Sequence, residues 1–295
     1  MSKPLLSVIV LAFNHETFIA ECLSSILSQN VDFPFEIIVA NDASTDGTKE
    51  IVKRFAAQND SIRDFHHDRN KGAAKNFEFA VKQSSGRIIS LCEGDDFWHA
   101  KDKLQTHRDE FRSSEAISLV YSNYRKISAE GDVLEEGCLR EQPETFELKD
   151  LIDKQGPSTH SMSFLKSVLP QSFPPDFFRV LNPDVFLMAW AISKGESRYI
   201  DKVQASYRVH PGGIWSQKNE LEKRLIRYAT LLKVYQNLPD NTRIEEEAII
   251  PSLFHLLTKT RRANQKLYGE ILAGLPQKLR WNYKLKTTYY RLKNG

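Results

Sequence analysis

The sequence from residue 36 to residue 48 reads Glu36-Ile-Ile-Val-Ala-Asn-Asp-Ala-Ser-Thr-Asp-Gly-Thr48. Its first part, Glu36–Ala40, is rich in β-branched side chains and has the length of a buried strand. The polar pair Asn41 and Asp42 follows at once, and the next residues form a turn with helix-capping side chains. The stretch therefore predicts a strand that ends in a polar pair and passes through a turn into a helix.

The same order of strand, turn and helix recurs in the first third of the chain. Strands are predicted over Leu6–Leu11 and Arg87–Cys92, and helices over Lys49–Gln58 and Ala73–Gln83. Strands that alternate with helices of about 10–15 residues favour βαβ units, a parallel sheet and the α/β class. Ligands of such sheets bind beyond the carboxyl ends of the strands, and polar clusters follow those ends in this sequence.

The densest of these clusters is an acidic turn, Glu93–Asp96, which contains three carboxylates in four residues: Glu93, Asp95 and Asp96. Like charges so close together repel one another, and a divalent cation would offset that repulsion. Mg²⁺ is typically bound through one or two carboxylates and the phosphates of a substrate. The pattern therefore favours a metal site, and the alternative is a solvated acidic turn.

Two further clusters offer ligands for a phosphorylated substrate. Arg69–Asn76 precedes a predicted helix, and its Lys75 and Asn76 are placed to reach a diphosphate or a sugar. The alternative for this segment is a plain turn with a solvated lysine. His210 stands beside a Gly-Gly pair on a mobile loop, which suits a metal or phosphate ligand; the alternative is a structural or exposed histidine. A structural or exposed role is expected for six further histidines: His66, His67, His99, His107, His160 and His255.

Asp184 opens a predicted helix over Pro183–Lys194. A carboxylate in the first turn is stabilised by the helix dipole, so we expect the pKa of Asp184 to be lowered. A dipole-stabilised carboxylate without a catalytic role is the alternative interpretation of this residue.

Length and composition exclude several classes of protein. The 295 residues are 41% hydrophobic and 27% charged, which is typical of a globular protein. No apolar run approaches the roughly 20 residues of a membrane span. Three cysteines are too few and too scattered for a disulfide framework or a zinc site. Met1–Pro4 leads straight into the first strand, so we expect no secretory leader and a cytoplasmic location.

The charge of the chain is concentrated near its end. Residues 254–295 contain ten Lys or Arg residues and one acidic residue, Glu270, so this segment carries +9. Because the whole chain carries +3, the remainder carries about −6. Leucine and aromatic side chains alternate with the basic ones, a pattern that fits an interfacial helix on the inner face of an anionic membrane. The alternative is a helical hairpin with a solvated basic face, and nucleic acid is not an expected partner.

In this order, the clusters resemble the motifs of the family 2 glycosyltransferases, which have the GT-A fold, over residues 5–215. The opening strand Ser7–Asn14 resembles the family's first nucleotide-contacting strand, and Asn41–Thr48 resembles its D-D-G-S-T-D-G-T turn. Further on, Asn70–Asn76 resembles the N-x-G-x-x-x-N segment, and Ser85–Asp96 resembles the strand that leads into the D-x-D metal motif.

Two later segments continue the resemblance: Asp184 to the E/D-D base motif, and Tyr207–Gly213 to the Y-R-x-H loop. The resemblance implies a Rossmann-like mixed sheet flanked by helices in one GT-A domain over residues 1–216. That domain would comprise a nucleotide-sugar half, 1–98, and an acceptor half, 99–216. A basic helical C-terminal extension, 217–295, would follow it.

The resemblance also implies a reaction and a role for each matching residue of this sequence. The resemblance implies an inverting transfer of a sugar from a nucleoside-diphosphate sugar, UDP favoured, to a hydroxyl of a glycan or lipid-linked acceptor in bacterial surface-polysaccharide synthesis. Asp184 would be the general base. Contacts to the nucleotide sugar would come from Ala12, Phe13, Asn14, Asn41, Asp42, Lys75, Asn76 and Asp95. The metal, Mn²⁺ or Mg²⁺, would be held by Glu93, Asp95, Asp96 and His210.

Three positions depart from the family pattern. Asn41 replaces the first aspartate of the usual pair, Glu93 stands where the metal motif begins with aspartate, and Asn182-Pro183 lacks the acid before the base. A catalytically inactive nucleotide-sugar-binding or scaffold protein is therefore the alternative function. A nucleotidyltransferase is disfavoured because no Gly-rich basic loop follows the first strand.

Overall fold

The computed structural model describes residues 4–154, 156–238, 246–275, 277, 280 and 283. The end of the predicted basic extension, 284–295, lies outside these residues, as do Pro239 and Pro276, where the sequence predicts helix breaks. The chain forms two compact units, which we describe separately. The first comprises Met1–Arg179 and Phe186–His210, and the second comprises Val180–Val185 and Pro211–Gly295. The predicted division at residues 98 and 216 stays a prediction.

The first unit is built on a mixed sheet, whose described strands number eight. Their order is β3-β2-β1-β4-β7-β5-β6, and β8 pairs with β5. The first four strands of the chain run parallel, as predicted, while β7 is antiparallel to both β4 and β5. The strands are β1 (Leu6–Ala12), β2 (Phe35–Asn41), β3 (Ile62–His66), β4 (Ile88–Glu93), β5 (Ile117–Ile127), β6 (Val133–Glu135), β7 (Met162–Leu165) and β8 (Glu196–Arg208).

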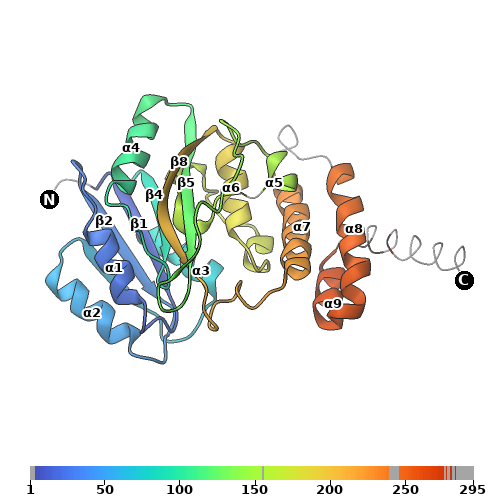
Figure 1. The fold of residues 1–295 in the computed structure, drawn as a ribbon, viewed down its shortest axis with the longest axis horizontal. Coiled ribbons are helices and arrows are strands. Elements are labelled where there is room, and N and C mark those ends of the chain that lie inside the picture. The colour runs from blue at the N-terminus through green and yellow to red at the C-terminus, as the bar shows by residue number, and fades with distance from the viewer. Residues whose placement is uncertain are drawn as a thin grey trace, which may run out of the picture. The chain divides into compact units, whose positions relative to one another are not determined.

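Helices flank this sheet, and α1 and α2 pack against each other beside β1 and β2 (Figure 1). Each helix has an apolar face; in α1, for example, the side chains of Ile19, Cys22, Leu23 and Ile26 are buried. The predicted mixed sheet flanked by helices is confirmed. The described helices of this part are α1 (Ile19–Leu27), α2 (Thr48–Gln58), α3 (Ala73–Gln83), α4 (Lys103–Ser113), α5 (Asp150–Asp153) and α6 (Asp184–Ile192), with short 3₁₀ turns η1 (Thr159–Ser161), η2 (Lys166–Val168) and η3 (Pro175–Phe178). The first two residues of α6, Asp184 and Val185, are counted with the second unit.

The described part of the second unit is mainly helical. It contains α7 (Glu220–Asn237), α8 (Glu246–Ala263) and α9 (Gln265–Gly274). Asn219 caps α7 by accepting a hydrogen bond from the Glu222 N–H, and the Glu222 carboxylate accepts one from the Asn219 N–H. Within the described residues, no helix combines the length and the apolar character that crossing a bilayer requires.

The sheet register determines where the polar clusters meet. Strand β1 lies between β2 and β4, with Ala12 opposite Asn41 and Leu11 opposite Glu93. The side chains of β1 and β2 that precede these ends are almost all buried. Because the three strands run parallel, their polar carboxyl ends lie at one edge of the sheet.

Candidate active site

The loops that follow β1 and β2 are joined by hydrogen bonds. The Asn14 N–H donates to Ser44 Oγ at 2.9 Å, and Asn14 Oδ1 accepts from the Thr45 N–H at 2.8 Å. Asn14 adopts a left-handed conformation with φ 57°, which asparagine tolerates better than most residues. Phe13 is left 43% exposed beside this junction. The two loops therefore form one connected surface at the ends of β1 and β2.

Asp42 is a buried carboxylate that holds the loop before α3. It accepts hydrogen bonds from the N–H groups of Lys71 and Gly72, both at 2.8 Å. Gly72 has φ 85°, a conformation that favours glycine. The observed partners of Asp42 thus come from the protein's own backbone, and the predicted contact with a base or ribose stays a prediction.

Asn41 is buried and pairs with a histidine. Its Nδ2 lies 3.2 Å from Nδ1 of His66, and His66 Nε2 lies 3.0 Å from Asp64 Oδ2. Because an amide nitrogen can only donate, Nδ1 of His66 is the acceptor and Nε2 carries the proton given to Asp64. This pairing supplies a physical reason for asparagine at position 41.

Lys75 and Asn76 lie in the first turn of α3 and differ in their surroundings. Asn76 is 1% exposed; its Nδ2 donates to the Ala40 carbonyl at 2.7 Å, and its Oδ1 accepts from His67 Nε2 at 3.0 Å. This amide fastens α3 to β2. Lys75 is exposed, so its ammonium group is open to an anionic ligand.

The acidic turn directs its carboxylates to two different groups of side chains. Asp95 meets two histidines: its Oδ2 lies 3.0 Å from His210 Nε2 and 3.7 Å from His15 Nε2. Burial alone would raise the pKa of Asp95, but the hydrogen bond from His210 and the electrostatic interactions with His15 and His210 hold it below its usual value. With its side chain 18% exposed, Asp95 stays ionised and accessible.

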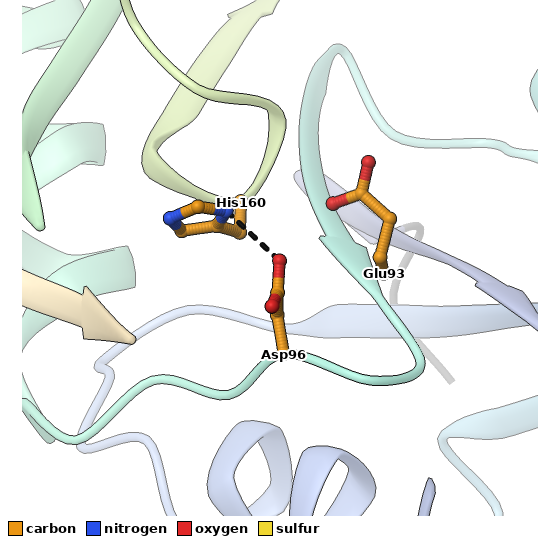
Figure 2. Close-up of side chains that lie close together, drawn as sticks. All are labelled: Glu93, Asp96 and His160. Carbon is orange, nitrogen blue, oxygen red and sulfur yellow. Dashed lines mark ion pairs between the residues drawn. The ribbon is translucent and has the colours of Figure 1, made fainter. Parts of the chain in front are cut away.

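Asp96 turns into the protein. Its Oδ1 accepts from the Arg208 N–H at 2.8 Å, and its Oδ2 lies 2.9 Å from His160 Nδ1. Burial lowers the pKa of His160 to about 4, so the imidazole is neutral near pH 7. Burial and the neighbouring charge of Asp95 raise the pKa of Asp96. Figure 2 shows His160 projecting from η1 toward Asp96.

Glu93 lies beside this pair at the end of β4 (Figure 2). Burial, together with the charges of Asp96 and Asp95, raises the pKa of Glu93 to about 8. Within the described residues its Oε2 is buried without a hydrogen-bond partner. A cation would stabilise this carboxylate in its ionised form.

Glu93, Asp96 and His160 are one group that could hold a metal ion. Each offers one ligand atom, and these atoms lie within 4.8 Å of one another. Carboxylate oxygens suit both Mg²⁺ and Mn²⁺, and an imidazole nitrogen suits the transition metals. The donor set therefore fits a divalent ion, and it includes His160, which the sequence interpretation had set aside.

Asp184, at the start of α6, contradicts one expectation. Burial raises the pKa of Asp184 to about 6. Hydrogen bonds from backbone N–H groups at the helix N-terminus and the charge of Arg227 lower this pKa, but by less than burial raises it. The expected lowering of this pKa by the helix dipole is therefore wrong, because desolvation outweighs it.

Sequence reasoning missed His15 as well as His160. His15 lies three residues beyond the end of β1, and a Cβ on Gly94 would come 2.7 Å from its Nδ1. Its place on a loop at the carboxyl edge of the sheet was the signal that could have identified it. His160 gives no such signal, because its proximity to Asp96 depends on tertiary packing.

The fold matches that of the GT-A glycosyltransferases. S. aureus TarS, residues 1–349 in complex with UDP-GlcNAc, superimposes with a TM-score of 0.65 at 19% identity, covering 93% of this chain and 82% of that one. The mannosyltransferase PcManGT from Pyrobaculum calidifontis, in complex with GDP-Man and Mn²⁺, gives 0.59 at 17% identity, covering 97% and 85%.

The chain belongs to glycosyl transferase family 2, whose sequence model matches residues 7–168, more than half of its length. Among its relatives are the uncharacterized protein Rv1520 of Mycobacterium tuberculosis, 26% identical over 211 residues, and the putative teichuronic acid biosynthesis glycosyltransferase TuaG of Bacillus subtilis, 30% identical over 133 residues. These alignments cover 71% and 45% of this chain, but only 60% and 52% of the relatives. The family resemblance is thus confirmed.

Proposed function

We propose that this chain is a metal-assisted inverting glycosyltransferase that moves a sugar from a nucleoside-diphosphate sugar to an acceptor hydroxyl. The observation that carries the proposal is the acidic turn of this family 2 chain. At the carboxyl edge of the sheet, its Asp95 lies beside two histidines, His15 and His210. UDP is the favoured nucleotide, in line with the UDP-GlcNAc complex of TarS.

The metal is proposed to lie on the acidic turn, and Mn²⁺ or Mg²⁺ fits its ligands. Asp95 and His210 are partly exposed, at 18% and 10%, so an ion on them can also reach a diphosphate. Glu93, Asp96 and His160, the group described above, are the deeper alternative position for the ion, and the Asp96 and His160 side chains are almost fully buried. The bound ion would offset the charge that develops on the departing diphosphate.

The donor is proposed to bind along the joined loops after β1 and β2. The exposed ring of Phe13 offers an apolar surface to the nucleotide base, next to Ala12 and Asn14. Lys75 offers a positive charge to the diphosphate. Asn41, Asp42 and Asn76 contribute by holding these loops and α3 in place through the hydrogen bonds described above.

Asp184 is proposed as the general base. The acceptor oxygen attacks the anomeric carbon, the bond from that carbon to the diphosphate breaks, and the hydroxyl proton passes to the Asp184 carboxylate. A base works best when its pKa lies near the operating pH, and a value of about 6 meets that condition. Attack opposite the leaving group inverts the anomeric centre.

The acceptor is proposed to be a glycan or lipid-linked sugar of a bacterial surface polysaccharide. The names of TuaG and of the E. coli chondroitin synthase, 31% identical over 134 residues, support this acceptor class. The basic segment 254–295 would bring the enzyme to the anionic inner face of the membrane.

The direct test is release of nucleoside diphosphate from a panel of UDP-, GDP- and dTDP-sugars, with Mn²⁺, Mg²⁺ or EDTA. We expect release from one donor, only with a metal, and none from Asp95→Ala. Donor binding without release in the presence of glycan and lipid-linked acceptors would instead support an inactive binding protein. Absence of both binding and release would contradict the proposal.

A further inference from the structure

Arg208, the last residue of β8, is a buried cation with an unusual set of partners. Its side chain is 3% exposed. Its guanidinium donates to three backbone carbonyls: Nε to Asp95 at 3.1 Å, and Nη1 to Ala129 at 3.0 Å and to Ser128 at 3.3 Å. Nη2 pairs with the carboxylate of Glu21 on α1. One side chain thus connects β8 with α1, the acidic turn and the turn after β5.

Aromatic rings complete the surroundings of this guanidinium. Its central carbon lies 4.7 Å from the ring centroid of Phe18 and 5.6 Å from that of Phe97. A planar guanidinium can contact rings through its faces while its edges donate hydrogen bonds. A lysine ammonium lacks both the plane and the fixed fork of donors, so it cannot reproduce this arrangement.

The position of Arg208 in the chain connects it to both partners of the Asp95–His210 pair. Its own N–H donates to Asp96 Oδ1 at 2.8 Å, while its Nε holds the Asp95 carbonyl. His210 follows two residues later and places its Nε2 3.0 Å from Asp95 Oδ2. The Phe18 ring that packs on the guanidinium also lies 4.9 Å from the His210 ring.

Packing alone does not explain an arginine here. Burying a cation carries a desolvation penalty that an apolar side chain of similar volume avoids. The Glu21 side chain is 52% exposed, so its ion pair compensates that penalty only in part. The remaining donors are used on backbone carbonyls, including one in the acidic turn, which indicates a role in holding that turn.

We propose that Arg208 is a positioning residue of the donor site, which holds the Asp95 carboxylate within hydrogen-bonding distance of His210. This inference rests on the proposed function, because it assumes that Asp95 and His210 bind the metal. Loss of the guanidinium would loosen the turn relative to the end of β8. The metal and the diphosphate would then bind more weakly even though the fold persists.

The test compares Arg208→Lys with Arg108→Lys. Arg108 is a matched control, because it is also a buried arginine, contacts a ring at 4.8 Å and pairs with a carboxylate, Asp32, away from the acidic turn. Each variant is assayed for thermal unfolding, for calorimetric binding of UDP with Mn²⁺, and for turnover of the active donor as Mn²⁺ is varied.

We expect Arg208→Lys to raise the Mn²⁺ concentration for half-maximal turnover and the Kd for UDP by about tenfold or more, the scale of lost support around a metal site. Its unfolding temperature should stay close to that of Arg108→Lys. Equal Mn²⁺ and UDP affinities in the two variants would overturn the inference.

A second variant covers the case in which Arg208→Lys does not fold. Glu21→Gln removes the negative charge that pairs with Nη2 of Arg208. Because the Glu21 side chain is half-exposed, we expect this variant to fold. We expect it to weaken UDP and Mn²⁺ binding several-fold, and wild-type binding would reject the inference. If the wild-type protein shows no metal-dependent binding or turnover at all, the proposed function fails, and the inference falls with it.

Discussion

At position 41 the side-chain amide meets the unprotonated nitrogen of an imidazole. Asn41 Nδ2 donates to His66 Nδ1, and Asn41 Oδ1 accepts from the Ser44 N–H at 3.3 Å. An aspartate at position 41 would still accept the hydrogen bond from the Ser44 N–H. Its other carboxylate oxygen, however, would face the unprotonated Nδ1 of His66, which is also an acceptor. The departure from the family pattern at position 41 is thus matched by the tautomer of His66.

Asn41→Asp should therefore destabilise the protein. Placing two acceptors against each other in a buried site costs about 1–3 kcal/mol. Urea unfolding of the variant and the wild type at pH 8 measures this loss, and equal stability of the two proteins would contradict the tautomer assignment.

Asp184 gives a pH prediction at the same scale. A general base must be ionised, so with a pKa of about 6 turnover should fall as the pH drops below 6. Asp184→Asn should lower turnover by about 10²–10⁴-fold. Turnover that stays constant down to pH 5, or an active Asn variant, would show that another group accepts the proton.

The raised pKa of Asp184 also affects stability. Between its usual value of 3.8 and about 6, the folded protein binds the proton more tightly than the unfolded chain does. The contribution of Asp184 to stability therefore decreases as the pH rises through this window, and above pH 6 the buried charge is a penalty. Asp184→Asn should stabilise the protein at pH 7.5 and have less effect at pH 4, as measured by thermal unfolding at both values.

At the scale of elements, the acidic turn depends on a glycine. A Cβ at position 94 would lie 2.7 Å from His15 Nδ1 and 2.8 Å from Ile19 Cδ1. We expect Gly94→Ala to cost about 1–3 kcal/mol through overpacking and to weaken Mn²⁺ binding by displacing His15 from Asp95. Gly269→Ala on α9 is the control, because a Cβ there meets nothing within 4 Å. Equal effects of the two substitutions would contradict the account of this turn.

The sequence predicts well the elements whose burial is local and continuous. The predicted helix Ala73–Gln83 coincides with α3, and the predicted strand Leu6–Leu11 falls one residue short of β1. The four-residue β7 and its antiparallel pairing with β4 and β5 were not predicted. Such a short strand carries little periodicity, and its partners are set by tertiary packing.

The same distinction applies to the site. Asp95 and His210 were identified because each belongs to a motif, and the structure brings them within 3.0 Å. Arg208 lies in the same Y-R-x-H motif as His210, but its contact with Asp95, 113 positions away, was not predicted. His160 belongs to no motif and contacts Asp96, 64 positions away. A single sequence does not encode contacts over such separations, so both roles became visible only in the structure.

At the scale of the whole molecule, the uneven charge makes a prediction about membranes. Changing Lys284, Lys286, Arg291 and Lys293 to Gln should weaken binding to anionic vesicles by about 1 kcal/mol per charge, and added salt should weaken wild-type binding in the same direction. The control changes four exposed basic residues of the first unit to Gln: Lys53, Arg54, Arg87 and Lys101. If both variants co-sediment with vesicles equally, the basic segment is not the membrane contact.

The proposed function depends on a divalent ion that the acidic turn holds for a nucleotide-sugar donor. Electron paramagnetic resonance of Mn²⁺ with UDP tests it most directly, because the signal of free Mn²⁺ decreases as the ion binds. We expect UDP-dependent binding in wild type, its loss in Asp95→Asn, and its retention in Asp60→Asn, a control at an exposed residue. Equal Mn²⁺ binding in wild type and Asp95→Asn, or none in wild type, would contradict it.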